Sequence, residues 1–292
     1  MFSRLDGTAI FDQFNVLVDE ARSSRGTEHA HAVLHTVRGA LLRQTGPQEI
    51  AYEDLSWAVQ NQGYLDDGDA THARVQLALI CFDAGLWDEA AQLAEAAASE
   101  VLAESEGPLS MVAYGLAALI PAARGQLGAW SRVLDVVANS SIRHGQMGQH
   151  GRTAALIWGA FARVDFEDAA ALLLKPRREP AFWRDALTSA VLTARAEYYC
   201  GRAAAGRAQL AELEGIPGGP PSLRSFAGDY IHGLIKSGLG DPEGIGLLYS
   251  ALETIGAERA QLRIRAPGPT GSGCPPNYPL GSVMRLRRNW LP

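Results

Sequence analysis

Residues 78–97 read ALICFDAGLWDEAAQLAEAA, an apolar stretch, a glycine and a second apolar stretch. The same arrangement returns at 118–137 (ALIPAARGQLGAWSRVLDVV) and at 157–174 (IWGAFARVDFEDAAALLL). It returns twice more, at 194–213 and at 231–252. Apolar residues three and four positions apart within each stretch indicate amphipathic helices rather than strands. The five copies therefore predict a repeated helical hairpin.

The turn between the two helices sets the period of the repeat. Consecutive turn residues lie 40, 39, 37 and 37 positions apart. Glycine at this position supplies the left-handed backbone that ends a helix, so the copy that has valine there has the weakest turn. The five predicted turn residues are Gly85, Gly125, Val164, Gly201 and Gly238.

Repetition of this kind predicts a stacked architecture. One hairpin cannot bury its apolar face alone, so neighbouring copies must pack on each other. The period exceeds the 34 residues of a tetratricopeptide unit, which suits similar hairpins with longer helices or loops. We predict an all-α fold of about six or seven tetratricopeptide-like hairpins stacked as a right-handed solenoid, with no globular centre.

Three parts follow from this division of the chain. Residues 1–65 hold N-terminal helices over 10–23, 28–44 and 47–62, which form degenerate or capping repeats. Residues 66–266 hold the repeats themselves, interrupted by a glycine-, histidine- and glutamine-rich loop expected at 140–151. Residues 267–292 are rich in proline and glycine and predict a disordered tail.

Composition excludes several classes of protein. The 292 residues are 47% hydrophobic, but no run long and apolar enough for a membrane span occurs, and the first residues lack a signal-peptide pattern. A net charge of -6 disfavours direct binding of nucleic acid by this chain. The three cysteines are far apart and give no disulfide framework or zinc spacing, which predicts a cytoplasmic location.

No motif for catalysis or for a cofactor stands out. Neither of the two lysines, Lys175 and Lys236, follows a glycine, so the chain has no Walker A motif. The glycine-rich run 238–244 follows a helical pattern rather than a strand, which argues against a dinucleotide fingerprint. We therefore expect no enzyme, no catalytic residue and no cofactor. A helical enzyme would instead need carboxylates or histidines gathered in a closed cavity.

Two clusters have the residue types of a metal site. His31 and His35 share one face of a predicted helix, a spacing that can hold zinc, but no third ligand is visible. Asp66, Asp67 and Asp69 resemble an acidic magnesium motif, yet Asp69 is a natural N-cap for the next helix and a dedicated site needs more oxygen ligands. Surface or half-buried histidines and a capped helix are the favoured interpretations, and no metal is expected.

A solenoid lines its concave face with the first helix of each hairpin. The residues six positions before the turn change along the chain from Leu79 and Leu119 to tryptophan, arginine and histidine. Aromatic and arginine side chains are enriched at interfaces, so this change predicts a groove for a partner. The alternative is that this register is core in the early hairpins and surface in the later ones. Tyr199 stands two positions before its turn residue, and with it the predicted partner-binding residues are Trp158, Arg195, Tyr199 and His232.

The last copy has the most specific sequence. It contains His232-Gly233 and Gly238, then Ala251-Leu252 and Ile255-Gly256-Ala257, then Arg259-Ala260 and 265–268 (RAPG). This order resembles the closing repeat of the large ATP-dependent regulators of the LuxR family, the MalT-like group of actinobacteria. Residues 85–91 (GLWDEAA) are similar to the inner repeats of that family, and the resemblance covers residues 10–268.

In that family an N-terminal ATPase holds the nucleotide, the tetratricopeptide-like region senses or couples, and a C-terminal helix-turn-helix binds DNA. This chain has no Walker A motif, and residues 268–292 stand where the helix-turn-helix would begin, so neither activity carries over. The resemblance implies a non-catalytic sensor region of a LuxR-family transcriptional regulator. Its groove would take a protein or a small-molecule inducer, and self-association is a further option. The alternative is a free-standing tetratricopeptide-like protein–protein adaptor.

Overall fold

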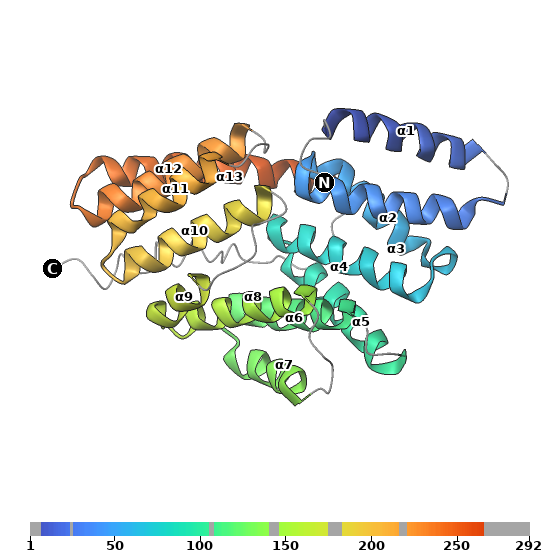
Figure 1. The fold of residues 1–292 in the computed structure, drawn as a ribbon, viewed down its shortest axis with the longest axis horizontal. Helices are drawn as coiled ribbons and strands as arrows, with labels where there is room; N and C mark the ends of the chain where they lie inside the picture. Colours follow the sequence, from blue (N-terminus) through green and yellow to red (C-terminus); the bar gives the residue numbers. More distant parts are fainter. Residues whose placement is uncertain are drawn as a thin grey trace.

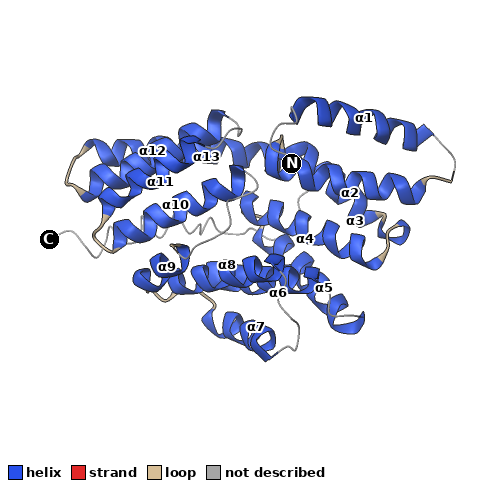
Figure 2. Cartoon of the chain, viewed as in Figure 1, coloured by secondary structure: helices blue, strands red, loops and turns tan. Residues whose placement is uncertain are grey.

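The computed structural model describes residues 7–23, 26–104, 108–139, 146–174, 183–215 and 221–265. These described residues form thirteen α-helices and two 3₁₀ helices, with no strand among them (Figures 1 and 2). The prediction of an all-α protein is therefore confirmed.

The first three helices are close to their predicted bounds. They are α1 (Gly7–Ser23), α2 (Glu28–Thr45) and α3 (Gln48–Gln60). The helices that follow are α4 (Asp67–Ala84), α5 (Trp87–Glu104), α6 (Pro108–Ala123), α7 (Leu127–Asn139), α8 (Gln146–Ala162), α9 (Phe166–Leu173), α10 (Trp183–Tyr199), α11 (Gly206–Gly215), α12 (Pro221–Gly238) and α13 (Glu243–Arg265), with the 3₁₀ helices η1 (Gln62–Tyr64) and η2 (Ala203–Ala205).

Four of the five predicted turn residues have a left-handed backbone. Their φ angles are 77° at Gly85, 72° at Gly125, 63° at Val164 and 75° at Gly201. At each of them the next residue donates its N–H to a carbonyl five positions back, as in a Schellman helix end. Among the described residues, Val164 is the only non-glycine with a positive φ.

The fifth turn prediction is wrong by two residues. Gly238 is the last residue of α12, and the left-handed residue is Gly240, with a φ of 79°. A Cβ atom at position 238 would clash with the Cβ of Ala203 and approach the ring of Tyr198 to 3.4 Å. Gly238 therefore serves close packing of α12 on η2 and α10, and α12 continues until the next glycine can turn the chain.

Two local predictions around helix starts need correction. Asp66, and not Asp69, caps α4, because the Asp66 Oδ1 accepts the N–H of Asp69 at 2.8 Å. The expected loop at 140–151 is helical from Gln146, where α8 begins, since burial of Ala155 and Ile157 on that helix outweighs the low helix propensity of its glycines. Residues 140–145 and the predicted tail at 267–292 lie outside the described residues.

Consecutive helices pair into six hairpins that follow α1. Along the chain, α2, α4, α6 and α8 contact each other in turn, and α10 contacts α12. The apolar core follows the same order, with one cluster drawn from α2 to α6 and another from α10 to α13. The hairpins therefore lie in a row in sequence order. The six hairpins are α2–α3, α4–α5, α6–α7, α8–α9, α10–α11 and α12–α13.

The two ends of this row touch, which the prediction of single file did not include. Helix α13 contacts α3 and α4, and α10 contacts α2. In Figure 1 the helices follow an arc from α1 through α4–α9 to α12, and α13 returns towards the N-terminal helices. With 23 residues, α13 is about 34 Å long, enough to reach across the arc. The contact between α2 and α10 joins first helices of distant hairpins, so the first helices do not line one uninterrupted open groove.

Candidate functional site

The predicted groove register loses burial only from the second copy onward. Leu79 is half-buried and Leu119 is buried, whereas Trp158 and Arg195 are half-buried and His232 is exposed. This is the gradient that the alternative interpretation expects, with core in an early hairpin and surface in the last. Burial in this register therefore does not by itself define a groove.

A continuous series of aromatic contacts connects two of the predicted partner-binding residues. The ring of Trp158 lies 5.8 Å from that of Phe82, and the ring of Tyr199 stacks on that of Phe166 at 4.3 Å. His232 lies on α12, outside these contacts. We name the half-buried rings the aromatic run; in order of contact they are Trp87, Phe82, Trp158, Phe161, Phe166, Tyr199 and Tyr198.

The repeat itself places these rings at the turn ends of the hairpins. Phe82, Phe161 and Tyr198 stand three residues before their turn residues, and Trp87 and Phe166 stand two residues after theirs. Each pair therefore flanks a left-handed turn. Five of the seven rings therefore lie close to a left-handed turn, and we name this side of the array the turn edge.

Guanidinium groups cover part of the aromatic run. The Arg195 guanidinium lies 5.0 Å from the ring centroid of Phe161 and 5.9 Å from that of Tyr199. Arg124 lies 6.0 Å from the Trp87 ring. Such cation–π contacts contribute about 0.5–1 kcal/mol at exposed sites and more where water is excluded. The turn edge thus combines flat apolar surface with fixed positive charge.

Acidic side chains balance arginines along this edge, and Arg124 donates to Asp88 at 2.5 Å. At the end of α10, Arg202 donates to Glu167 at 2.8 and 3.0 Å and to the buried Glu197 at 2.5 Å. The hydrogen bond from Arg202 lowers the pKa of Glu167. This bridge ties α9 to the end of α10 beside the stacked rings of Phe166 and Tyr199, and it holds that part of the edge in place.

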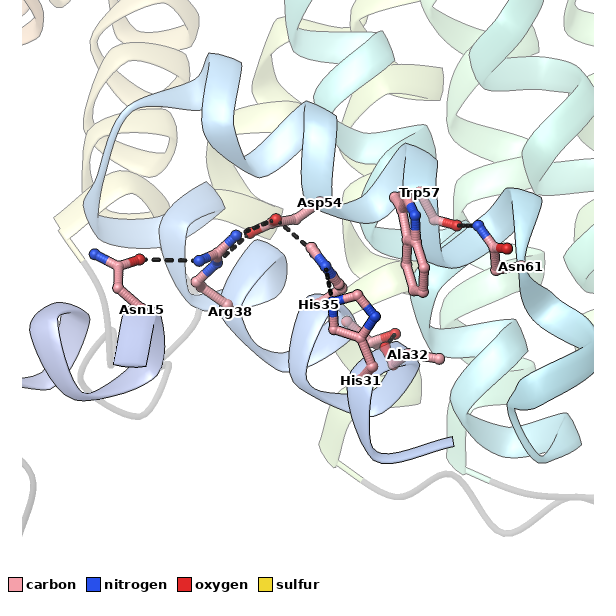
Figure 3. Close-up of polar contacts among 9 residues, drawn as sticks. Asn15, His31, Ala32, His35, Arg38, Asp54, Trp57 and Asn61 are labelled. Carbon is pink, nitrogen blue, oxygen red and sulfur yellow. Dashed lines mark hydrogen bonds and ion pairs between the residues drawn. The ribbon is translucent and has the colours of Figure 1, made fainter. Parts of the chain in front are cut away.

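A second constellation lies between α1, α2 and α3 and is drawn in Figure 3. Asp54, only 3% exposed, accepts hydrogen bonds from His35 Nδ1 at 2.7 Å and from Arg38 Nε and Nη2 at 2.7 and 2.6 Å. Arg38 also donates from Nη1 to the Asn15 side chain on α1 at 2.9 Å. On the other side, the Nε2 atoms of His35 and His31 are 2.9 Å apart. We name His31, His35, Arg38 and Asp54 the histidine–aspartate cluster.

Electrostatics keep Asp54 ionised inside this cluster. Burial alone would raise its pKa, but the hydrogen bonds from Arg38 and His35 outweigh burial and hold the pKa below its ordinary value. The hydrogen bond to Asp54 in turn raises the pKa of Arg38. A carboxylate can only accept, so His35 donates from Nδ1, and in the neutral imidazole the lone pair then lies on Nε2, which faces His31.

This arrangement can orient a histidine and pass a proton. An aspartate behind an imidazole is how hydrolases fix a general base, but there the far nitrogen faces a hydroxyl or thiol nucleophile. Here the far nitrogen of His35 faces His31 instead. The indole of Trp57 packs 4.5 Å from both imidazole rings and covers them on one side.

Sequence reasoning found two members of the cluster and missed the rest. The pairing of His31 with His35 on one helix face is what the four-residue spacing predicts. Asp54 was missed, although it shares the face of Ala51, Leu55 and Ala58, which are fully buried. An acidic residue within an apolar helical stripe was the available signal.

Three further observations concern the other motifs of the described part of the chain. No group of three or more histidine, cysteine or acidic residues is arranged there to hold a metal ion. Asp66, from the acidic motif, is engaged as a helix cap. None of the described helices is long and apolar enough to cross a membrane.

Comparison with known proteins adds no relative. No protein-family model matches the chain, and no curated protein and no solved structure matches it. What the fold and the site define is an all-helical row of hairpins with an aromatic turn edge and a buried histidine–aspartate cluster.

Proposed function

We propose that this protein is a non-catalytic binding module that takes a protein segment along its aromatic run. One observation carries the proposal: seven half-buried rings touch in series from α4 to α10, and Arg195 lies over two of them. Aromatic and arginine side chains are the residue types that dominate binding energy at protein interfaces. Rigid rings also offer large contact area at low entropic cost.

The shape of the aromatic run favours a protein segment over a small inducer. Its rings come from three hairpins and contact one another in series, so they form an extended strip. A segment with apolar side chains and at least one carboxylate would suit it, since carboxylates form strong charge-assisted hydrogen bonds with guanidinium groups such as those beside these rings.

The larger role that we propose is the sensor or coupling region of a LuxR-family transcriptional regulator. Its support is the sequence of the last copy, now seen as α12 and α13, and the similarity at 85–91. A partner that binds two curvatures of a right-handed, tetratricopeptide-like solenoid unequally would shift the population between them. The contact of α13 with α3 and α4 is a place where such curvatures would differ.

The alternative role is a free-standing protein–protein adaptor with the same surface. The flanking reading frames distinguish the two roles. Helix-turn-helix sequence in another frame after codon 266 favours the regulator, and its absence favours the adaptor.

The surface itself is tested with peptides selected on the immobilised full chain from a display library, followed by anisotropy titrations. Arg195→Ala should weaken the selected peptide about tenfold or more, as removal of an interface anchor does. The matched control is Arg207→Ala, an exposed arginine on α11, which should bind as the parent does. His232→Ala distinguishes the turn edge from the predicted groove, because it should weaken the affinity only of a partner that binds in the groove. Equal affinities for the two arginine variants would reject the proposed surface.

A further inference from the structure

The two imidazoles of the histidine–aspartate cluster converge at an angle rather than in line. The Nε2 atoms of His31 and His35 are 2.9 Å apart, and the ring centroids are 4.5 Å apart with the planes 65° from parallel (Figure 3). Two rings joined by a linear N–H···N hydrogen bond of that length would have centres about 5 Å apart. The contact is therefore bent, and its two distances are those expected of nitrogens that face a common point beside the line joining them.

That geometry is close to what a metal ion requires of two neighbouring ligands. Imidazole nitrogens bind late transition metals at about 2.0–2.1 Å, and two of them at a right angle lie about 2.9 Å apart, with ring centres about 4.5 Å apart. Both distances agree with those of His31 and His35. Little movement of α2 is needed, because both residues belong to one helix.

Asp54 supplies a second, independent observation. Histidines that ligate metals almost always donate their other ring N–H to a carboxylate or a carbonyl, which fixes the tautomer and aims the lone pair. His35 Nδ1 donates to Asp54 at 2.7 Å, and Arg38 fixes Asp54 from the other side with two bonds. The positive charge of Arg38 is neutralised by that pairing, so it does not repel a cation at the imidazoles.

We propose that His31 and His35 chelate one late divalent transition-metal ion, Cu²⁺ in preference to Zn²⁺, with Asp54 as the positioning residue behind His35. The order of metals follows from the Irving–Williams series and from the near-right-angle disposition of the nitrogens, which suits square-planar copper. The metal takes the place of the hydrogen bond between the rings: the Nε2 proton of His31 passes to solvent, Nδ1 of His31 takes up a proton from solvent so that the ring remains a neutral imidazole, and water fills the remaining coordination positions. This site is on α2 and is independent of the aromatic run.

The test uses the full chain without a histidine tag, stripped with EDTA and titrated with CuCl₂ or ZnCl₂ by calorimetry and tryptophan fluorescence. We expect one Cu²⁺ per chain, bound more tightly than Zn²⁺. Fluorescence should fall on copper binding, because Trp57 is 4.5 Å from both rings, and Trp57→Phe should remove most of that fall.

Variants assign the ligands. His31→Ala removes the outer ligand and should weaken Cu²⁺ at least tenfold, and Asp54→Asn should weaken it about 10–100-fold through His35. His29→Ala is the matched control on the same helix, since His29 Nδ1 is bonded to the carbonyl of Tyr64 at 2.7 Å. Circular dichroism checks that each variant folds, and His31→Ala suffices if Asp54→Asn does not. Equal copper affinity of His31→Ala and His29→Ala, or no saturable binding by the parent, overturns the proposal.

Discussion

Replacing Val164 by glycine should stabilise the protein. Val164 follows the end of α8 and has a left-handed φ of 63°. Every other described residue with a left-handed φ is glycine. For an L-residue this conformation costs about 1–2 kcal/mol, because Cβ crowds the following carbonyl oxygen. The valine side chain is 68% exposed, so its removal loses little packing.

The expected gain is the difference between two terms. Relief of the left-handed strain stabilises the folded state by about 1–2 kcal/mol. The greater freedom of glycine in the unfolded chain offsets about 0.5–1 kcal/mol of that gain. The net stabilisation is therefore about 0.5–1 kcal/mol, which for a chain of this size raises Tm by about 2 °C. Val164→Ala should gain less, since alanine keeps the Cβ atom.

Urea and thermal unfolding followed by circular dichroism measure this change, and hydrogen exchange localises it. The amide of Asp165, which donates to Ala160 O at 2.9 Å across the turn, should exchange more slowly in Val164→Gly. The reciprocal control is Gly125→Val, where φ is 72° and an added Cβ meets nothing within 4 Å, so that only backbone strain is introduced. It should destabilise. The reasoning fails if Val164→Gly is neutral or destabilising while Gly125→Val destabilises.

Two further predictions concern buried positions. Asp54→Ala leaves the charge of Arg38 largely buried without its carboxylate and should cost about 3–5 kcal/mol in urea unfolding at pH 7. The pKa of Asp54 is lower in the folded than in the unfolded protein, so its contribution to stability is full above about pH 4 and is lost as the pH falls through the folded pKa. The loss of unfolding free energy in Asp54→Ala should therefore shrink in acid. A loss that does not change with pH would contradict this explanation. Gly159→Ala should cost about 1–3 kcal/mol, because the new Cβ would clash with the Trp130 indole. The control is Gly246→Ala in α13, where the new Cβ has no atom within 4 Å and alanine should raise the free energy of unfolding by up to about 1 kcal/mol. Equal effects of the two variants on stability would argue against the packing of α7 on α8.

The helices and most of their turns were predictable because the physics that sets them is local. Apolar spacing along residues 78–97 identifies two helices without reference to the rest of the chain, and the left-handed end between them needs only a glycine at the right place. Even Val164 was recognised as a turn from its place in the period, and the structure gives it the glycine-like φ.

The tertiary structure decided what local sequence leaves open. Both Gly238 and Gly240 could have ended α12, and the close approach of Ala203 selected the second. Phe82 meets Trp158, and His35 meets Asp54, only because separate helices pack against each other. A helical period specifies which face of a helix is apolar, but not which distant helix covers it or at what angle. The turn-edge position of the aromatic run and the contact of His35 with Asp54 therefore depend on packing between segments far apart in the chain.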